Sequence, residues 1–307
     1  MKCLYCYKEA AQDFHSGCSK KFFGRQDPPL VPYTEKDLLA LAEKMVKGKA
    51  TVSGVQPKLS LHIEKPEREQ EKLTIVNLWG QYILKPPSPK WKELPQNEDL
   101  TMHLAQLSGI RTAEHSLVRL GSGELAYITK RMDRDSDSKL HMEDMCQLLG
   151  RLTEDKYKSS HEQIAKEIKR SSTNPGLDLL RFYEVTLFSF LTGNADMHLK
   201  NFSLIKRNLQ YELAPAYDLL STALVVEGDD EELALTLCGK KKRLKKSDFS
   251  NAMMSSGVPQ KVVENVLSKY AKVHSKWLEF IDKSFLSEEM KTTYKELIVS
   301  KSNQIFS

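Results

Sequence analysis

The segment GNADMHLKNF, residues 193–202, constrains the fold more than any other part of this chain. It follows an apolar stretch with helical spacing, residues 176–191, and it leads into FSLIKRNLQYEL, two β-like runs separated by a turn. The next segment, APAYDLLS, contains Asp218. The order helix, polar loop, hairpin and second aspartate predicts that Asp196, Asn201 and Asp218 belong to one site.

Phosphoryl transfer needs a carboxylate that accepts the proton of an attacking hydroxyl, and oxygen ligands that hold Mg²⁺ against nucleotide phosphates. Asp196 is the candidate catalytic base, and Asn201 and Asp218 are the candidate Mg²⁺ ligands. His198 and Lys200 are candidates to neutralise charge on the transferring phosphoryl group, although a surface role for Lys200 is an open alternative. Each residue alone is compatible with a cap or turn, but their order favours phosphotransfer.

The strand-rich first half offers the other parts that a kinase requires. TVSGVQPKLS, residues 51–60, predicts a glycine-containing turn over the phosphates, and its candidate ATP-binding residues are Ser53, Gly54, Val55, Gln56 and Lys58. Lys85 ends the β-like run QYILK. Glu98, in a helix expected over residues 96–108, is its candidate ion-pair partner, with Glu93 and Asp99 as alternatives.

The segment YITKRM is expected to join the two halves, so that backbone groups of Lys130, Arg131 and Met132 meet adenine. A strand-rich half with one helix therefore precedes a helical half, and the parts of a kinase occur in the required order. We expect three regions: a Cys/His segment over residues 1–30, an N-lobe over 31–132 and a helical catalytic C-lobe over 133–307.

These motifs resemble the HipA family of serine/threonine protein kinases, the toxins of bacterial toxin–antitoxin systems. The resemblance runs from about residue 51 to the C-terminus and rests on SGVQPK, ILKP, KRMDR, MEDMCQLLG, DMHLKNFSL and APAYDLLS. It implies an α+β, bilobal protein-kinase-like fold that uses ATP and Mg²⁺, with Asp196 as base, Asn201 and Asp218 on the metal and Lys85 on the phosphates. It also suggests that the substrate is a translation component, of the aminoacyl-tRNA synthetase class.

The resemblance further implies regulation by autophosphorylation in the glycine-containing loop. Ser53 and Thr51 are the candidate acceptors, and Ser53 is favoured. The short region before this loop is similar to the HipT-type branch. The implied partners are a HipB-like helix-turn-helix antitoxin and a small HipS-like protein, with DNA bound only through the antitoxin. Two other functions stay open: a small-molecule kinase of the aminoglycoside or choline type, and a non-catalytic corepressor with a kinase fold.

The first residues contain a second constellation, CLYC followed by HSGC. Cys3, Cys6, His15 and Cys18 have the spacing of two ligand pairs, which is typical of a tetrahedral Cys₃His zinc site. A segment this short can hardly bury a core of its own, and a structural metal would supply folding energy. The alternative is a tail of free thiols packed on the kinase.

Composition adds little to these motifs. The chain has 307 residues, 28% of them charged, and its net charge of +5 is too small to indicate nucleic-acid binding. The basic run at residues 240–246 is either a contact for nucleic acid or a charged turn before a helix capped by Ser247. The start has no apolar signal region and no stretch is long enough to cross a bilayer, so we expect a cytoplasmic protein.

Overall fold

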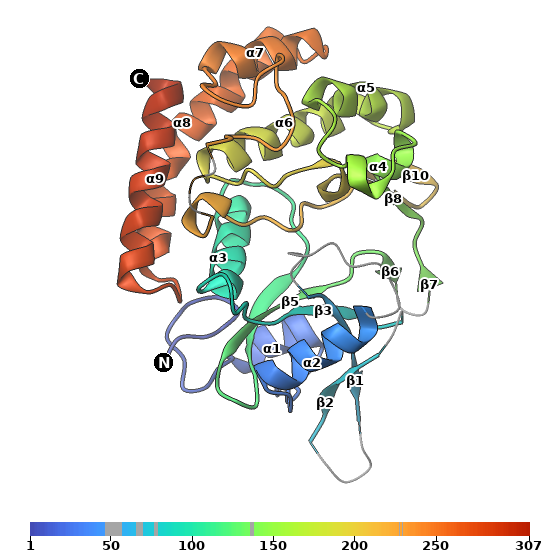
Figure 1. Ribbon diagram of the computed structural model, residues 1–307, viewed down its shortest axis with the longest axis vertical. Coiled ribbons are helices and arrows are strands. Elements are labelled where there is room, and N and C mark those ends of the chain that lie inside the picture. The colour runs from blue at the N-terminus through green and yellow to red at the C-terminus, as the bar shows by residue number, and fades with distance from the viewer. Residues whose placement is uncertain (47–56, 66–69, 77–78, 136–137, 227, 229) are drawn as a thin grey trace. The chain divides into compact units, whose positions relative to one another are not determined.

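The computed structural model describes residues 1–46, 57–65, 70–76, 79–135, 138–226, 228 and 230–307 of the chain. These residues form two compact units, and most of their helices and strands are labelled in Figure 1. The strand-rich unit comprises Met1–Asp99, Ala113–Met132 and Lys283–Phe285. The helical unit comprises Leu100–Thr112, Asp133–Asp282 and Leu286–Ser307.

The strand-rich unit is built on an antiparallel sheet with the strand order β2-β1-β3-β5-β4. Its strands are β1 (Leu59–Glu64), β2 (Lys72–Ile75), β3 (Tyr82–Lys85), β4 (His115–Arg119) and β5 (Leu125–Lys130). The central strands β3 and β5 pair Lys85 with Tyr127. Each of these two strands has a hydrogen-bonded neighbour on both sides. Lys85, the last residue of β3, therefore lies on an inner strand and not at the edge of the sheet.

Helices α1 (Ser16–Phe23) and α2 (Glu35–Val46) also belong to this unit. Leu4, Phe14 and Phe22 from the N-terminal segment share one buried core with Leu59 and Leu84 of the sheet. In YTEKDLLALAEKMVKG the apolar spacing predicts a helix with Thr34 as its N-cap. At the start of α2 the Thr34 hydroxyl accepts a hydrogen bond from the Asp37 amide at 3.2 Å, which confirms this N-cap. The N-terminal segment therefore obtains its core from the sheet.

Helix α3 (Leu94–Leu107) begins two residues before the predicted helix and ends one residue before its predicted end, and Gly109 lies in the turn that follows. Gly109 has a φ of 77°, the left-handed conformation that glycine adopts most easily at a helix end. The residues of α3 up to Asp99 belong to the strand-rich unit.

The helical unit is organised around helix α6 (Pro175–Leu191), whose side chains are mostly buried. Its other α-helices are α4 (Met145–Leu148), α5 (His161–Ser171), α7 (Lys246–Ser255), α8 (Gln260–Asp282) and α9 (Glu288–Phe306), and its 3₁₀ helices are η1 (Thr153–Asp155), η2 (Leu199–Asn201) and η3 (Thr222–Leu224). Among the residues that the structure describes, no helix combines the length and apolar character that a bilayer span requires.

The predicted hairpin is confirmed as β9 (Ser203–Arg207) and β10 (Gln210–Leu213). Asn208 and Leu209 form its turn with φ values of 47° and 65°, the pattern of a two-residue type I′ loop. Strand β8 (Met142–Asp144) joins β9 on the other side. A second, short pair consists of β6 (Arg134–Asp135) and β7 (Ser138–Lys139). The hairpin places the loop before β9 and the segment after β10 at the same end.

Two local predictions were wrong. The apolar spacing of MEDMCQLLG predicts a helix, but its first three residues pair with β9 and only Met145–Leu148 are helical. Ser247 does not cap α7, because the helix already begins at Lys246 and the Asp248 carboxylate accepts the Lys245 amide at 2.8 Å. The adjacent lysines of the basic run, Lys241 and Lys242, form ion pairs with acidic residues, which supports the charged-turn interpretation.

Candidate active site and metal site

Hydrogen bonds within the polar loop after α6, residues 193–202, fix its shape. Asn194 is fully buried, and its side-chain oxygen accepts the Asp196 amide at 3.1 Å. Five residues later, the Asn201 side-chain nitrogen donates to the Asp196 carbonyl at 2.9 Å. Because that bond uses the amide nitrogen, the amide oxygen is the atom that Asn201 can offer to a metal ion. The spacing D-x-x-x-x-N thus closes a compact loop around Asp196.

The Asp196 carboxylate accepts a hydroxyl donor in this structure. The Tyr157 hydroxyl, from the segment after η1, donates to Oδ1 of Asp196 at 2.5 Å. The Tyr157 ring also lies edge-on to His198, with ring centroids 5.0 Å apart. Sequence reasoning missed Tyr157, since it lies 39 residues before Asp196 and outside the motif.

His198 is a buried imidazole between charged groups. Burial lowers its pKa to about 4, despite the opposing influence of the Asp196 and Asp218 carboxylates. The imidazole is therefore uncharged at neutral pH, which favours a positioning role over charge neutralisation. That both carboxylates act on this pKa also indicates that Asp196 and Asp218 lie near the same ring.

Asp218 has a φ of 55°, a left-handed conformation that few residues other than glycine, asparagine and aspartate adopt. Such backbone strain is frequent at functional sites. The preceding residue, Tyr217, anchors this segment because its hydroxyl donates to the Lys200 carbonyl at 2.8 Å. The Lys200 ammonium pairs with the Asp144 carboxylate at 2.6 Å, so its charge is directed to the end of β8.

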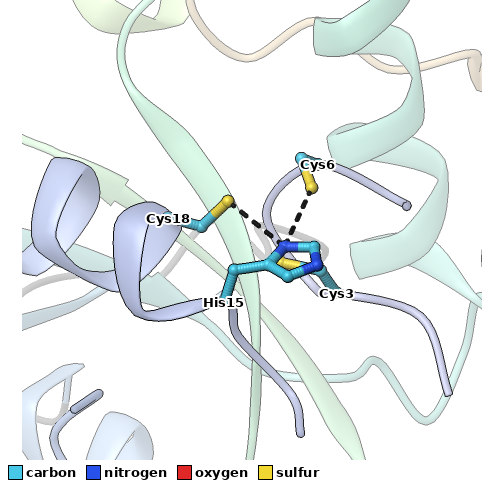
Figure 2. A group of neighbouring side chains, drawn as sticks. All are labelled: Cys3, Cys6, His15 and Cys18. Atoms are coloured by element: carbon cyan, nitrogen blue, oxygen red, sulfur yellow. Dashed lines mark hydrogen bonds between the residues drawn. The ribbon is translucent and has the colours of Figure 1, made fainter. Parts of the chain in front are cut away.

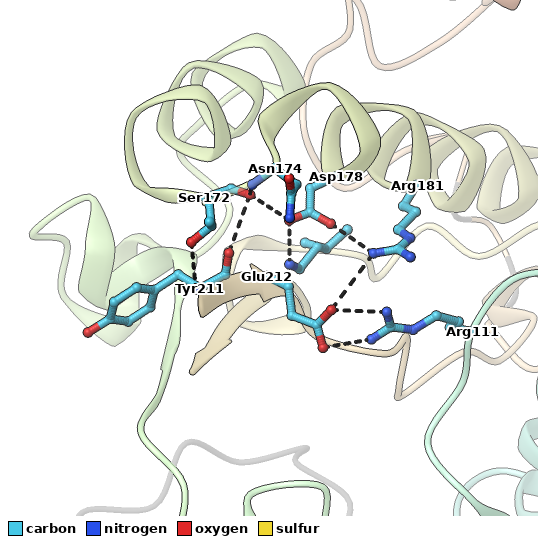
Figure 3. Close-up of polar contacts among 9 residues, drawn as sticks. Arg111, Ser172, Asn174, Asp178, Arg181, Tyr211 and Glu212 are labelled. Carbon is cyan, nitrogen blue, oxygen red and sulfur yellow. Dashed lines mark hydrogen bonds and ion pairs between the residues drawn. The ribbon is translucent and has the colours of Figure 1, made fainter. Parts of the chain in front are cut away.

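A buried carboxylate that the sequence did not point to connects the hairpin to α6 (Figure 3). Asp178 is fully buried, and its Oδ2 accepts the Leu213 amide at 2.9 Å and the Ser172 hydroxyl at 2.6 Å. Its other oxygen accepts from Arg181 at 3.1 Å. Beside it, Glu212 binds Arg111 through two hydrogen bonds of 3.0 and 3.1 Å. These contacts fix the end of β10, five residues before Asp218.

In the strand-rich unit, the structure identifies the partner of Lys85. The Lys85 ammonium lies 2.5 Å from the Glu98 carboxylate, and both side chains are almost completely buried. The same ammonium lies 5.3 Å from the centre of the Tyr127 ring. Asp99, one of the alternatives, instead accepts hydrogen bonds from Tyr7 and His115. A lysine on β3 paired with a glutamate on α3 is the arrangement that a kinase uses to hold nucleotide phosphates.

The other predicted ATP-binding residues lie near the end of β5 and in the sequence before β1. The Lys130 amide donates to the Glu114 carbonyl and the Arg131 amide to the Gln81 carbonyl, each at 2.8 Å, so neither N–H is free for adenine. Met132 follows as the last residue of that stretch of the strand-rich unit. Lys58 is exposed just before β1. Thr51, Ser53, Gly54, Val55 and Gln56 lie outside the described residues.

The four predicted zinc ligands converge on one point (Figure 2). One donor atom from each of Cys3, Cys6, His15 and Cys18 lies within 4.8 Å of all the others. His15 Nδ1 is 3.5 Å from the Cys6 sulfur and 3.6 Å from the Cys18 sulfur. Thiolates and an imidazole are the donor set that zinc prefers, so these residues fit a structural zinc ion.

The pKa values of the thiols in this cluster differ. Burial acts to raise the pKa of the Cys3 thiol, but hydrogen bonds from the backbone of His15, Tyr5 and Cys6 together lower it. Burial and the neighbouring thiols raise the pKa of Cys18 to about 12. A cation bound between the sulfur atoms would stabilise their thiolate forms.

The sequence model of the protein family called the HipA-like C-terminal domain matches residues 50–277 of this chain. The chain belongs to this HipA-like family. The family region includes Lys85, Glu98, Asp196, Asn201 and Asp218, but not the Cys/His cluster.

Curated relatives carry kinase names. The chain is 34% identical over 229 residues to a predicted kinase of Sinorhizobium fredii, Y4dM, covering 69% of this chain and 55% of that protein. It is 29% identical over 211 residues to the serine/threonine-protein kinase toxin HipA of Shewanella oneidensis, covering 62% and 47%. The chain spans about half the length of the curated relatives it matches.

Solved structures confirm the predicted fold class. HipA of Shewanella oneidensis, in a complex with HipB and operator DNA, has a TM-score of 0.71 at 23% identity, covering 91% of this chain and 72% of that one. The kinase CtkA of Helicobacter pylori has a TM-score of 0.55 at 16% identity, covering 80% and 93%. The fold is therefore kinase-like. The assignment to the HipT-type branch stays a prediction.

Proposed function

We propose that this protein is an ATP-dependent serine/threonine protein kinase that acts as a HipA-like toxin. The observation that carries the proposal is the loop from Asn194 to Asn201, which presents the Asp196 carboxylate to a hydroxyl donor and holds Asn201 against it. The buried Lys85–Glu98 pair supports the same function from the strand-rich unit.

In this proposal each residue has a separate task. Asp196 accepts the proton of the attacking serine or threonine hydroxyl. In this structure the same carboxylate accepts a hydrogen bond from the Tyr157 hydroxyl. The Asn201 amide oxygen and the Asp218 carboxylate are the Mg²⁺ ligands, and Lys85, oriented by Glu98, binds the phosphates. Bound Mg²⁺ would neutralise charge on the nucleotide. His198 remains neutral and, as a buried residue of the loop itself, helps to position it.

The finer assignments extend this proposal to regulation and partners. We propose that Ser53, with Thr51 as the alternative, accepts phosphate from the kinase itself, and that the cellular substrate is a translation component of the aminoacyl-tRNA synthetase class. The complex of Shewanella oneidensis HipA with HipB and operator DNA supports a HipB-like partner here. A HipS-like partner is a further proposal that rests on the resemblance to the HipT-type branch.

Intact-mass spectrometry after incubation with Mg²⁺-ATP tests the kinase activity. The wild type should gain phosphate that maps to Ser53 or Thr51, and Asp196→Asn, which preserves the size of the side chain, should gain none. Asp155→Asn in η1 is the matched control, because Asp155 pairs with Lys158 and not with the loop. ATP binding without any phosphate on the wild type would contradict autophosphorylation and favour a small-molecule substrate or a corepressor.

A further inference from the structure

The Cys/His cluster lies outside the kinase family region, yet it is connected to the candidate ATP site within the strand-rich unit. We propose that Cys3, Cys6, His15 and Cys18 bind one zinc ion, and that this zinc site holds Tyr7 on Asp99 and so positions the start of α3, which carries Glu98. The second half of this inference rests on the proposed kinase function, because it concerns the partner of Lys85.

The first step is the geometry of the donor atoms. Zinc in a tetrahedral site lies about 2.3 Å from sulfur and about 2.0 Å from nitrogen, which separates a sulfur and a nitrogen ligand by roughly 3.6 Å. The two printed distances from His15 Nδ1 to the sulfurs of Cys6 and Cys18 are 3.5 and 3.6 Å. The cluster therefore has the dimensions of a zinc site.

The second step is the protonation of His15. Its other ring nitrogen, Nε2, lies 2.8 Å from the Glu9 carbonyl oxygen, which only accepts hydrogen bonds. Nε2 therefore carries the proton, and the lone pair of Nδ1 is directed at the thiols, as Figure 2 shows. A ligand histidine held by a backbone carbonyl in this way is the usual outer-shell arrangement of zinc sites.

The third step is the turn that contains two of the ligands. The Tyr7 amide donates to the Cys3 carbonyl at 2.9 Å, and the Cys3 amide donates to the Lys8 carbonyl at 2.8 Å. Within this turn Tyr7 has a φ of 62°, which is strained for a residue with a large side chain. Cys6 directly precedes Tyr7 and Cys3 lies four residues before it. A metal ion bound to both cysteines would therefore keep the turn closed and the strain in place.

The fourth step leads from Tyr7 to the ATP site. Tyr7 and Asp99 are buried, and the Tyr7 hydroxyl donates to Oδ2 of Asp99 at 2.7 Å. The other oxygen of Asp99 lies 2.7 Å from His115 Nδ1, and the His115 ring stacks on Tyr127. Asp99 is next to Glu98, so the tyrosine fixes the turn of α3 whose carboxylate pairs with Lys85.

The metal is tested first, on the full-length chain purified without chelator. Elemental analysis should find about one zinc per chain in the wild type and in Cys238→Ser, whose cysteine lies outside the cluster, and much less in Cys18→Ser. If Cys18→Ser does not fold, chelation of the wild type followed by addition of zinc gives the same comparison at constant sequence. A wild type that neither contains zinc nor takes it up would overturn the metal site.

The connection to α3 is tested by hydrogen exchange, which requires no catalysis. Removal of zinc should speed amide exchange in residues 94–99 and weaken ATP binding, and added zinc should restore both. Tyr7→Phe should keep its zinc but show the faster exchange and about two- to tenfold weaker ATP binding, the range for one lost hydrogen bond.

Tyr5→Phe is the matched control, because Tyr5 lies in the same turn but its ring packs on Phe22. Tyr5→Phe should behave as the wild type. Unchanged exchange in both zinc-free protein and Tyr7→Phe would overturn the connection. If no variant transfers phosphate, the kinase proposal fails, while zinc content and exchange still decide this inference.

Discussion

The Tyr157 hydroxyl donates a 2.5 Å hydrogen bond to the Asp196 carboxylate, the group proposed to accept the proton of a substrate hydroxyl. A substrate serine or threonine would have to replace this phenol before it could react. Tyr157 is 41% exposed, so its side chain has room to move away from the loop. Tyr157 and a substrate hydroxyl therefore compete for the same carboxylate, that of Asp196.

We therefore expect Tyr157→Phe to bind protein substrate more tightly. Loss of one competing hydrogen bond, worth about 0.5–1.5 kcal/mol, should lower KM by about two- to tenfold. Steady-state phosphorylation of a peptide substrate measures this effect. Tyr211→Phe, which removes a phenol from β10 near His141, should leave KM unchanged. A higher KM in Tyr157→Phe would show that the phenol helps to bind substrate and does not compete with it.

The Lys85–Glu98 pair should contribute to both folding and nucleotide binding. Glu98→Gln replaces the carboxylate beside a buried ammonium with a neutral amide, so we expect a loss of about 3–5 kcal/mol in the free energy of unfolding and weaker ATP binding. The double change Lys85→Met with Glu98→Leu removes both charges and should recover much of that stability without restoring ATP binding. Urea denaturation and nucleotide titration separate the two effects, and a double variant that bound ATP normally would contradict the role of Lys85.

Asp178 should hold the hairpin in place without contacting the nucleotide. In Asp178→Asn the carboxylate that accepts the Leu213 amide and the Ser172 hydroxyl loses its charge, and we expect the protein to be about 1–3 kcal/mol less stable. Glu212→Gln alters a more exposed ion pair of the same network and should cost less than about 1 kcal/mol. Equal stabilities of the two variants in denaturation experiments would refute this assignment.

The parts of the site that the sequence could predict are local. The D-x-x-x-x-N loop, the hairpin and the Thr34 cap depend on residues within a few positions of one another, where spacing decides the structure. The choice of Glu98 over Glu93 and Asp99 was open, because only the packing of α3 decides which carboxylate meets Lys85. Tyr157 and the Tyr7–Asp99 bond could not be predicted, since each joins segments that are far apart in the chain.

The stability of the helical unit should depend on pH through its buried histidines. His161, the first residue of α5, is fully buried and its ring packs on Phe182 of α6. Burial lowers its pKa to about 3. The unfolded chain binds a proton on this ring below about pH 6.5, whereas the folded chain does not, so stability is greatest above pH 6.5 and is lost as the pH falls. The expected loss between pH 7 and pH 5 is about 2 kcal/mol for this histidine.

Denaturant titrations of the full chain at pH 7 and pH 5 measure this dependence. The variant His161→Leu, which fills a similar space without a titrating group, should lose roughly 2 kcal/mol less than the wild type between the two pH values. His141→Gln is the control for the replacement of a histidine, because His141 is exposed beside Glu143. If His161→Leu and the wild type lost equal stability at pH 5, the acid sensitivity would have to arise from other groups, among them His198, whose pKa burial lowers to about 4.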